Sequence, residues 1–488
     1  IRSTAGYLSD MMTAPIHHDL VRAIPTERWD IDIIDGHLHE VRSRMGNIMP
    51  NVDRFDIEIF SVHASEATII DPQHRVLIME SISVMNSNTE WISRNTTGVY
   101  VGTAWTEYNY HTITCRTPVN AYSATSAALS AASGRLAFTF DLKGPALSID
   151  TACSSSLVAA HVGTRAVGTR ECATAAICGV NLTLLAYTTA MFQRAGMLAP
   201  DGRCKTLDAS ADGYVRAEGC EIILLAASSD DVTQLSVALG GSAVNQDGRS
   251  SSLTAPNGPT QHAVIKSALL DGRFSASDVT SLHLHGTGTS LGDPIEIGGA
   301  LGALADDSRV LVLGAVKSWI GHAECAAGAV GLVHAATNLA SARMSSVAHL
   351  RFVNSHVASV MSVANTTTGL PKTLQSHGLK SRVAGVSSFA FQGTNAHAIL
   401  PVFLRLSTCA VETCISNLDA LRRHWIHTTQ TYLVEICHAI HYLEESCSIE
   451  AQCFDGMMSS ADVTIAGRPI LPFDVALDFS HIHYLNQS

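Results

Sequence analysis

The chain has 488 residues, of which 46% are hydrophobic and 15% charged, a composition typical of a large globular α/β protein that excludes a disordered or fibrous chain. Its formal net charge of −12 argues against wholesale binding to nucleic acid, because neutralising phosphates requires an excess of lysine and arginine. No apolar run approaches the roughly 20 residues of a transmembrane helix, so we expect no membrane span.

The first of three predicted regions covers residues 1–230 and alternates short apolar runs with glycine turns. Thr97–Gly102 is predicted as a strand that leaves through such a turn. Residues 145–151 are predicted as a strand that runs into a helix rich in alanine, valine and glycine, and this helix should be buried on most sides. No apolar strand is found in residues 1–16, so we expect the sheet of this region to lack its first strand.

The second region covers residues 231–401 and has a similar rhythm. Residues 281–285 and 309–316 are predicted as buried strands, because both are short apolar runs bounded by turns that contain glycine. The two regions together predict an α/β protein built from two halves.

The third region, residues 402–488, differs in character. Residues 418–445 have helical spacing, and two closely spaced prolines make residues 467–473 extended. We expect a flanking, linker-like segment. The 12 cysteines of the chain form no CxxC pair, which favours free thiols in a reducing compartment, the cytoplasm or an organelle such as a plastid.

A cysteine stands where the strand at 145–151 passes into its helix, in the segment DTACSSSL at residues 150–157. Unpaired backbone N–H groups and the positive end of the helix dipole would favour the thiolate of Cys153. The same N–H groups can hold the oxyanion that forms when a thioester is attacked. The alternative is a buried structural cysteine, the commoner fate of a single cysteine, and the local pattern leaves both interpretations open.

Two histidines follow the strands of the second region. His285 opens the loop HGTGTS, and His322 closes the segment KSWIGH, with Lys317 and Glu324 nearby. Two histidines in loops that contain glycine, beside a cysteine at the head of a helix, indicate a Cys–His–His site. Neutral histidines can donate hydrogen bonds to a developing enolate or oxyanion.

Two competing interpretations of this region are weaker. His283 and His285 could form a metal-binding pair, but no carboxylate or third histidine is close in the sequence, so we expect no metal. The run GTGT at residues 286–289 lacks both the GxGxxG and the GxxxxGK[ST] pattern, so nucleotide binding is not expected.

Taken together, these segments resemble the β-ketoacyl synthases of modular polyketide synthases and type I fatty acid synthases. DTACSSSL is similar to the nucleophile motif of that family, HGTGT with GDPIE at 292–296 to its first histidine motif, and Lys317 with GHAE at 321–324 to its second. Further similar stretches are DPQHR at 71–75, DGRCK at 201–205, ADGYVR at 211–216, residues 245–257, SSF at 387–389 and GTNAH at 393–397. The resemblance spans residues 19–400.

The resemblance implies a thiolase-like fold, in which two related βαβαβαββ halves form a five-layered αβαβα arrangement, normally in a homodimer. It implies an acyltransferase in which Cys153 takes an acyl group from the phosphopantetheine arm of an acyl-carrier protein. A malonyl-type extender on the carrier protein then loses CO2 and attacks the Cys153 thioester. No bound cofactor is implied, since the carrier protein brings the phosphopantetheine.

The resemblance also assigns roles to the residues beside Cys153. His285 and His322 would stabilise the enolate and assist decarboxylation, while Lys317 and Glu324 would tune and position that pair.

The remaining roles concern substrate binding. Thr287 and Thr289 fall where the family binds the pantetheine arm. The backbone N–H groups of Cys153 and Phe391 would form the oxyanion hole, and Phe391 falls at the position of a gating phenylalanine. Starter unit, chain length and polyketide or fatty-acid output depend on a pocket that the sequence does not place.

Several positions depart from the family pattern. Trp319 stands where asparagine is usual, so the packing beside His322 must differ. Ala390 and Gln392 replace glycines of the gating loop, and a side chain there costs roughly 1 kcal/mol if the position needs a positive φ. Two further glycines are replaced by Ala217 and Glu221.

Three functions are compatible with these features. The leading hypothesis is a chain-elongating condensing enzyme of polyketide or fatty acid biosynthesis. A non-elongating synthase that only transfers or gates acyl chains usually lacks a catalytic histidine, and here both are present. An inactive dimerisation subunit is disfavoured because Cys153 is retained.

Overall fold

The computed structural model describes residues 2–3, 19–29, 43–89, 92–227, 236–306, 310–341, 343–364, 366–371, 375–376, 383–403, 463–465 and 468–470. The chain divides into two compact units, residues 1–227 with 237–401 and residues 228–236 with 402–488. In the second unit, β17 (Val463–Ile465) and β18 (Arg468–Ile470) form an antiparallel hairpin, which confirms extended backbone within the stretch predicted at 467–473. The helix predicted at 418–445 lies outside the described residues.

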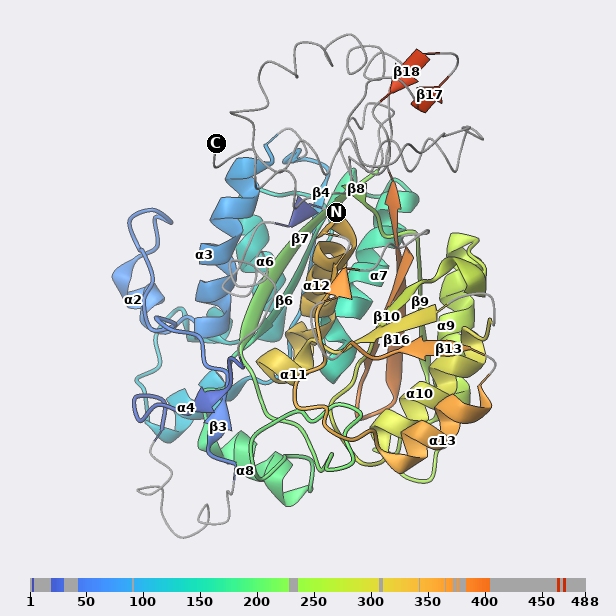
Figure 1. Ribbon diagram of the computed structural model, residues 1–488. Coiled ribbons are helices and arrows are strands. Elements are labelled where there is room, and N and C mark those ends of the chain that lie inside the picture. The colour runs from blue at the N-terminus through green and yellow to red at the C-terminus, as the bar shows by residue number, and fades with distance from the viewer. Residues whose placement is uncertain are drawn as a thin grey trace, which may run out of the picture. The chain divides into compact units, whose positions relative to one another are not determined.

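The first unit contains two large sheets (Figure 1). One of them includes β5 (Ala146–Ile149), the strand that precedes the predicted nucleophile in the chain. Its strand order is β1 (Arg2–Ser3), β7 (Gly219–Ala226), β6 (Thr174–Asn181), β4 (Thr97–Gly102) and β5 (Ala146–Ile149). β4 runs parallel to β5 and β6, and β7 runs antiparallel to β6. The two predicted strands are confirmed as β4 and β5. β1 lies at one edge of this sheet, within residues 1–16, where no strand was predicted. Its two residues are too few to form a recognisable apolar strand pattern.

The second sheet carries both predicted histidine segments. Its strand order is β13 (Thr367–Gly369), β11 (Val310–Gly314), β10 (Ser281–His283), β15 (Val383–Phe389), β16 (Thr394–Phe403) and β8 (Ser236–Val237), and β9 (Gly241–Gln246) also pairs with β16. β10, β11, β13 and β15 are parallel, whereas β16 is antiparallel to β15 and β9. β10 and β11 each end two residues earlier than predicted, so His285 lies in the loop beyond its strand.

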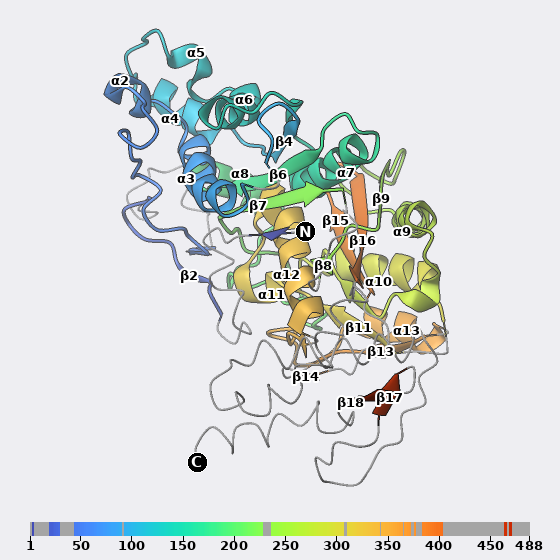
Figure 2. The ribbon, with the colours of Figure 1, turned by 90° about the horizontal axis from the view of Figure 1, so that it is seen from above.

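Helices cover both sheets and fill the space between them (Figures 1 and 2). α3 (Pro72–Ser87) and α6 (Leu129–Thr139) cover the outer face of the first sheet, and α9 (Gly258–Gly272), α10 (Gly292–Ala303) and α13 (Ser355–Val363) cover the outer side of the second. α7 (Ser155–Gly168) and α12 (Ala327–Ser341) lie between the sheets. The order of layers is therefore αβαβα, as expected. α7 is buried along most of its length, which confirms that prediction.

The shorter elements complete the described chain. They are β2 (Arg22–Ala23), β3 (Met45–Gly46), α2 (Ala64–Ala67), α4 (Glu107–Thr114), α5 (Ser123–Ser126), α8 (Ala186–Arg194), α11 (Lys317–Ile320), β12 (Arg343–Met344) and β14 (Gln375–Ser376), with 3-10 turns η1 (Ala152–Ser154), η2 (Ala276–Asp278) and η3 (Glu324–Ala326). Within the described ranges, no helix is both long and apolar enough to cross a bilayer.

Gly102 closes β4 directly against the first turn of α7. An ideal Cβ at this position would stand 2.4 Å from the backbone nitrogen of Ser156 and 2.7 Å from the carbonyl carbon of Ser155. Backbone atoms cannot move aside as the end of a side chain can, so Gly102→Ala should lower the free energy of unfolding by about 3 kcal/mol. Gly134→Ala on α6 is the matched control, because nothing lies within 4 Å of its Cβ. Equal stabilities of the two variants in urea unfolding would contradict this close packing.

Glu221 lies in the interior of β7, opposite Gly179 of β6. Its carboxyl group is completely buried, and neither oxygen has a hydrogen-bond partner among the described residues. Burial, followed by the charge of Glu80, raises the pKa of Glu221 from 4.5 to about 8. The folded protein therefore holds this proton at neutral pH, whereas the unfolded chain releases it.

The stability that Glu221 contributes is fully present below pH 4.5 and is lost as the pH rises towards 8, because a raised acid pKa favours the folded state only while the group is protonated. Glu221→Gln removes the titration and keeps the shape. The difference between the unfolding free energies of wild type and variant should shift by a few kcal/mol between pH 5 and 8, measured by urea unfolding across that range. A difference independent of pH would show that this carboxyl does not titrate as described.

Candidate active site

Cys153 lies in η1, between β5 and α7. The residue before it, Ala152, has a φ of 51°, in the left-handed region that residues with a side chain rarely adopt. The chain therefore turns sharply at the nucleophile. The hydroxyl of Ser388 on β15 donates a hydrogen bond of 2.7 Å to the carbonyl oxygen of Cys153, which ties this turn to the second sheet.

The surroundings of Cys153 do not favour its thiolate. Burial, followed by the charge of Glu324, raises the pKa of the thiol to about 12. Lys317 and backbone hydrogen bonds from Phe391 and Cys153 lower the pKa, but they do not outweigh the burial. The thiolate expected at this helix start is therefore wrong for the resting site, because desolvation penalises the charged form. The thiol must give up its proton to a base when it attacks.

Two carboxylates of α10 hold the loop that carries His285. Glu296 accepts hydrogen bonds from the backbone N–H groups of His285, at 2.6 Å, and Gly286, at 2.8 Å. Asp293 accepts from the N–H of Gly288 at 3.1 Å. Gly286 and Gly288 have φ of 48° and 78°, so this path needs glycine. The sequence pattern placed both carboxylates beside the loop but did not indicate that they bind its backbone.

The rings of His285 and His322 lie 5.4 Å apart with their planes at 89°. The backbone N–H of Glu324 donates to Nδ1 of His322 over 3.2 Å, which assigns the proton of the neutral ring to Nε2. Neither that Nε2 nor Nδ1 of His285 has a hydrogen-bond partner in the part of the chain that the structure describes. Burial, followed by the charge of Lys317, holds the pKa of both rings well below the usual range. Both histidines are therefore neutral at neutral pH.

The remaining predicted residues lie on adjoining segments. Lys317 begins α11 and is buried, and this burial lowers its pKa. Thr287 is buried and Thr289 half-buried in the His285 loop, where the Thr289 hydroxyl accepts from the N–H of Gly292 at 3.2 Å. Phe391 follows β15 and is half-buried.

Three departures from the family pattern are accommodated. The indole N–H of Trp319 donates to the carbonyl oxygen of Ser346 at 2.6 Å, so its single donor is satisfied. Neither Ala390 nor Gln392 has a positive φ, whereas Gly393 has a φ of 95°. The strain considered for the first two positions therefore does not arise.

Sequence reasoning missed Arg216, which is 4% exposed. Its guanidinium donates to the carboxylates of Glu324 and Glu107 and to the hydroxyl of Thr189. The stretch ADGYVR contained this residue, but only as support for the resemblance. A buried arginine requires partners, but both the burial and the partners appear only in the folded chain, so the sequence held no signal for them.

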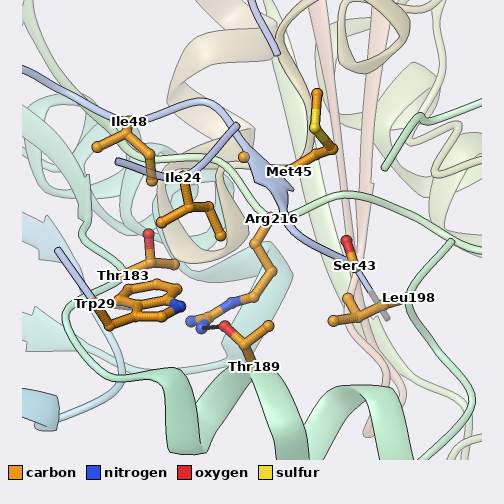
Figure 3. A pocket seen from close by; sticks show the side chains of 10 residues that line it. Ile24, Trp29, Ser43, Met45, Ile48, Thr183, Thr189, Leu198 and Arg216 are labelled. Carbon is orange, nitrogen blue, oxygen red and sulfur yellow. Dashed lines mark hydrogen bonds between the residues drawn. The ribbon is translucent and has the colours of Figure 1, made fainter. Parts of the chain in front are cut away.

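A small pocket borders Arg216 rather than Cys153 (Figure 3). Its volume of about 10 Å³ is close to the room that one water molecule needs. The indole N–H of Trp29 in its wall is buried without a hydrogen-bond partner among the described residues. The lining consists of Ile24, Trp29, Ser43, Met45, Gly46, Ile48, Thr183, Thr189, Leu198 and Arg216.

Comparison with protein families shows what the chain is similar to. The family model of the β-ketoacyl synthase N-terminal domain matches residues 16–231, and that of the C-terminal domain matches residues 237–351.

Curated relatives are polyketide synthases by name. A phenolphthiocerol/phthiocerol polyketide synthase of Mycobacterium tuberculosis is 36% identical over 398 residues, which cover 78% of this chain and 21% of that protein. Polyketide synthase GfsE of Streptomyces halstedii is 39% identical over 391 residues, which cover 77% of this chain and 10% of that protein. The chain thus spans about a fifth or less of these relatives.

Solved structures with the same fold are ketosynthase domains. The oxazolomycin ketosynthase domain OzmH KS7 of Streptomyces albus JA3453 has a TM-score of 0.72 at 29% identity, with 80% of this chain and 72% of that chain covered. The ketosynthase from module 6 of the bacillaene synthase of Bacillus subtilis 168 has a TM-score of 0.72 at 28% identity, with 86% and 74% covered. The five layers are therefore those of a thiolase-like fold.

Proposed function

This chain belongs to the β-ketoacyl synthase family, and from that premise we propose that it condenses an acyl chain on Cys153 with a malonyl-type extender, with loss of CO2. One arrangement carries the proposal: the rings of two neutral histidines lie 5.4 Å apart, with ring nitrogens unpartnered among the described residues. The His285 ring lies 5.9 Å from that of Phe389, and the adjacent Ser388 holds the backbone carbonyl of Cys153. The curated relatives are polyketide synthases by name, which favours a polyketide over a fatty acid as the product.

In the first step, the Cys153 sulfur attacks the thioester carbonyl of an acyl group held on the phosphopantetheine arm of an acyl-carrier protein. We assign the base to His285, because its Nδ1 has no hydrogen-bond partner among the described residues, whereas Nδ1 of His322 already accepts from Glu324. The backbone N–H groups of Cys153 and Phe391 would hold the oxyanion. Collapse of the intermediate releases the pantetheine thiol, which takes the proton from His285, and leaves the acyl group on Cys153.

In the second step, a malonyl-type carrier thioester loses CO2, and the electron pair of the broken C–C bond forms an enolate. The Nε2–H of His322 would donate to the enolate oxygen. The enolate carbon attacks the Cys153 thioester and expels the thiolate, which takes up one proton from solvent. The product is a β-ketoacyl group on the carrier protein.

Supporting roles follow from the charges and the loop. Burial lowers the pKa of His285 and His322, and the charge of Lys317 would help to keep both rings neutral by lowering it further. Thr287 and Thr289 share the loop of His285 and would bind the pantetheine arm, so no cofactor is assigned to the chain itself.

We also propose a homodimer formed through β5. This strand is at the edge of its sheet, and every residue of it is exposed or half-exposed, with Leu147 at 46% and Phe138 of the neighbouring α6 at 88%. An open edge strand with apolar neighbours pairs readily with another strand, and a second copy supplies an identical one. Light scattering should give twice the chain mass, and a monomer at micromolar concentration would contradict the dimer.

We place the chain in a reducing compartment, the cytoplasm. All seven cysteines in the described part of the chain are unpaired, as free thiols are in such a compartment.

The enzymatic proposal is tested by two successive reactions of the purified chain. An acyl-carrier thioester should add the acyl mass to the peptide that contains Cys153. A malonyl carrier protein should then remove that mass and yield a β-ketoacyl carrier. Acylation without this product would instead support a non-elongating synthase, and no acylation would contradict both enzymatic functions.

A further inference from the structure

We propose that Arg216 and Glu107 are positioning residues that hold Glu324, and through it His322, for the decarboxylation step. This inference rests on the proposed function, because it assigns the residues to one step of that reaction.

The guanidinium of Arg216 uses all three of its nitrogens. Nε donates to Glu324 Oε1 at 2.5 Å, and Nη2 donates to Glu324 Oε2 at 3.3 Å and to Glu107 Oε1 at 3.0 Å. Nη1 donates to the hydroxyl of Thr189 at 3.0 Å, the contact drawn in Figure 3. The guanidinium also lies 5.3 Å from the centre of the Phe192 ring. These contacts come from three elements, so the position of Arg216 is fixed.

The backbone around Arg216 holds the histidine as well. The N–H of His322 donates to the carbonyl of Val215 at 2.8 Å, and the N–H of Ala217 donates to the carbonyl of His322 at 2.9 Å. The side chain of Arg216 thus holds Glu324 while its neighbours hold His322. Any displacement of this segment moves the backbone and the side-chain partner of the histidine together.

Glu324 needs such support because its backbone is strained. Its φ is 42°, in the left-handed region that residues with a side chain rarely adopt. The N–H of the same residue donates to Nδ1 of His322. If Glu324 relaxed towards ordinary backbone angles, this N–H would turn away, and the proton of His322 would no longer be fixed on Nε2.

Glu107 fixes the far side of Arg216. It begins α4 and is buried. Its Oε1 accepts from Arg216, and its Oε2 accepts from the backbone N–H groups of Leu184 and Leu185, both at 2.7 Å. Glu107 therefore ties Arg216 to the loop between β6 and α8. Because both of its carboxylate oxygens already accept hydrogen bonds, we assign Glu107 a positioning function and not a role as an acid or base.

The contacts of Arg216 predict which step depends on it. They reach Glu324, Glu107, Thr189 and Phe192, and none of these hydrogen bonds or ring contacts reaches Cys153. Acylation, which uses Cys153, should depend on Arg216 less than decarboxylation, which uses the donor on His322. Burial and the charges of Lys317 and Arg216 lower the pKa of His322, so a variant that keeps a positive charge at position 216 should leave His322 neutral.

The test uses Arg216→Lys, which keeps the charge and loses the planar fork, and Glu107→Gln, which keeps the shape and loses the charge. Arg135→Lys is the matched control, because Arg135 forms a 2.5 Å ion pair with Glu66 outside the site. Acylation of Cys153 and CO2 release from malonyl carrier protein are timed separately, each across pH 5.5–8.5.

Arg216→Lys and Glu107→Gln should release CO2 about tenfold more slowly or worse, and acylate within about threefold of wild type. Neither variant should move the acid limb of decarboxylation to a higher pH, because Arg216→Lys keeps the positive charge and Glu107→Gln removes a negative one. The Arg135 variant should match wild type in both steps. If Arg216→Lys does not fold, Glu107→Gln alone carries the test.

Equal losses in both steps, or no loss in either, would overturn the positioning role while leaving the proposed function standing. A wild-type chain that forms no β-ketoacyl product would overturn the proposed function and this inference together.

Discussion

Cys153→Ala is expected to abolish acyl transfer, with a loss of at least about 10⁴-fold in the rate of product formation. The sulfur is the only atom of this chain proposed to form a bond to the acyl group, and alanine offers no replacement. The surrounding turn should survive, because its hydrogen bond to Ser388 uses the backbone carbonyl of Cys153 and not its side chain. The measurement is the intact mass of the protein after incubation with an acyl-carrier thioester.

The control for this variant is Cys115→Ala, since Cys115 is an exposed free thiol that could react without catalysis. The Cys115 variant should acylate as wild type does. A Cys153→Ala protein that still gains the acyl mass would contradict the assignment of the nucleophile.

His322→Ala is expected to slow condensation by about 10²- to 10³-fold, the usual effect of removing one preorganised donor from a developing oxyanion. Acylation should persist, because Nδ1 of His322 is already occupied by the N–H of Glu324, which leaves His285 as the base. The rate of β-ketoacyl formation from protein acylated beforehand isolates this step.

His161→Ala provides the comparison. His161 is half-buried on α7, where its ring nitrogen lies 2.9 Å from the hydroxyl of Ser242, outside the cluster around Cys153. Its replacement should leave the condensation rate unchanged. If the His322 variant condenses as fast as the His161 variant, His322 does not stabilise the enolate.

The sequence could predict the chemistry of this site better than its electrostatics. Cys153, His285 and His322 each stand in a short motif at the end of an element, and motifs of this kind are local. The pKa of Cys153 is set by burial and by Glu324, which is distant in the chain. A prediction from the helix start alone therefore had the wrong direction.

The partners of Arg216 were beyond prediction for the same reason. Glu107 lies 109 positions away and Glu324 lies 108 positions away, and only the folded chain brings the three together. The ends of the strands were mispredicted for a different reason. The apolar pattern continues to Leu284, but β10 and its pairing end at His283, and hydrophobicity alone does not show where pairing ends.

The most direct measurement follows the carbon that the proposed reaction releases. Malonyl carrier protein labelled with ¹³C in its free carboxyl group is added to protein acylated on Cys153, and ¹³CO2 and β-ketoacyl product are counted together. We predict one ¹³CO2 for each β-ketoacyl group, with the label absent from the product. Product that retains the label, or acylated protein that yields neither species, would contradict decarboxylative condensation at Cys153.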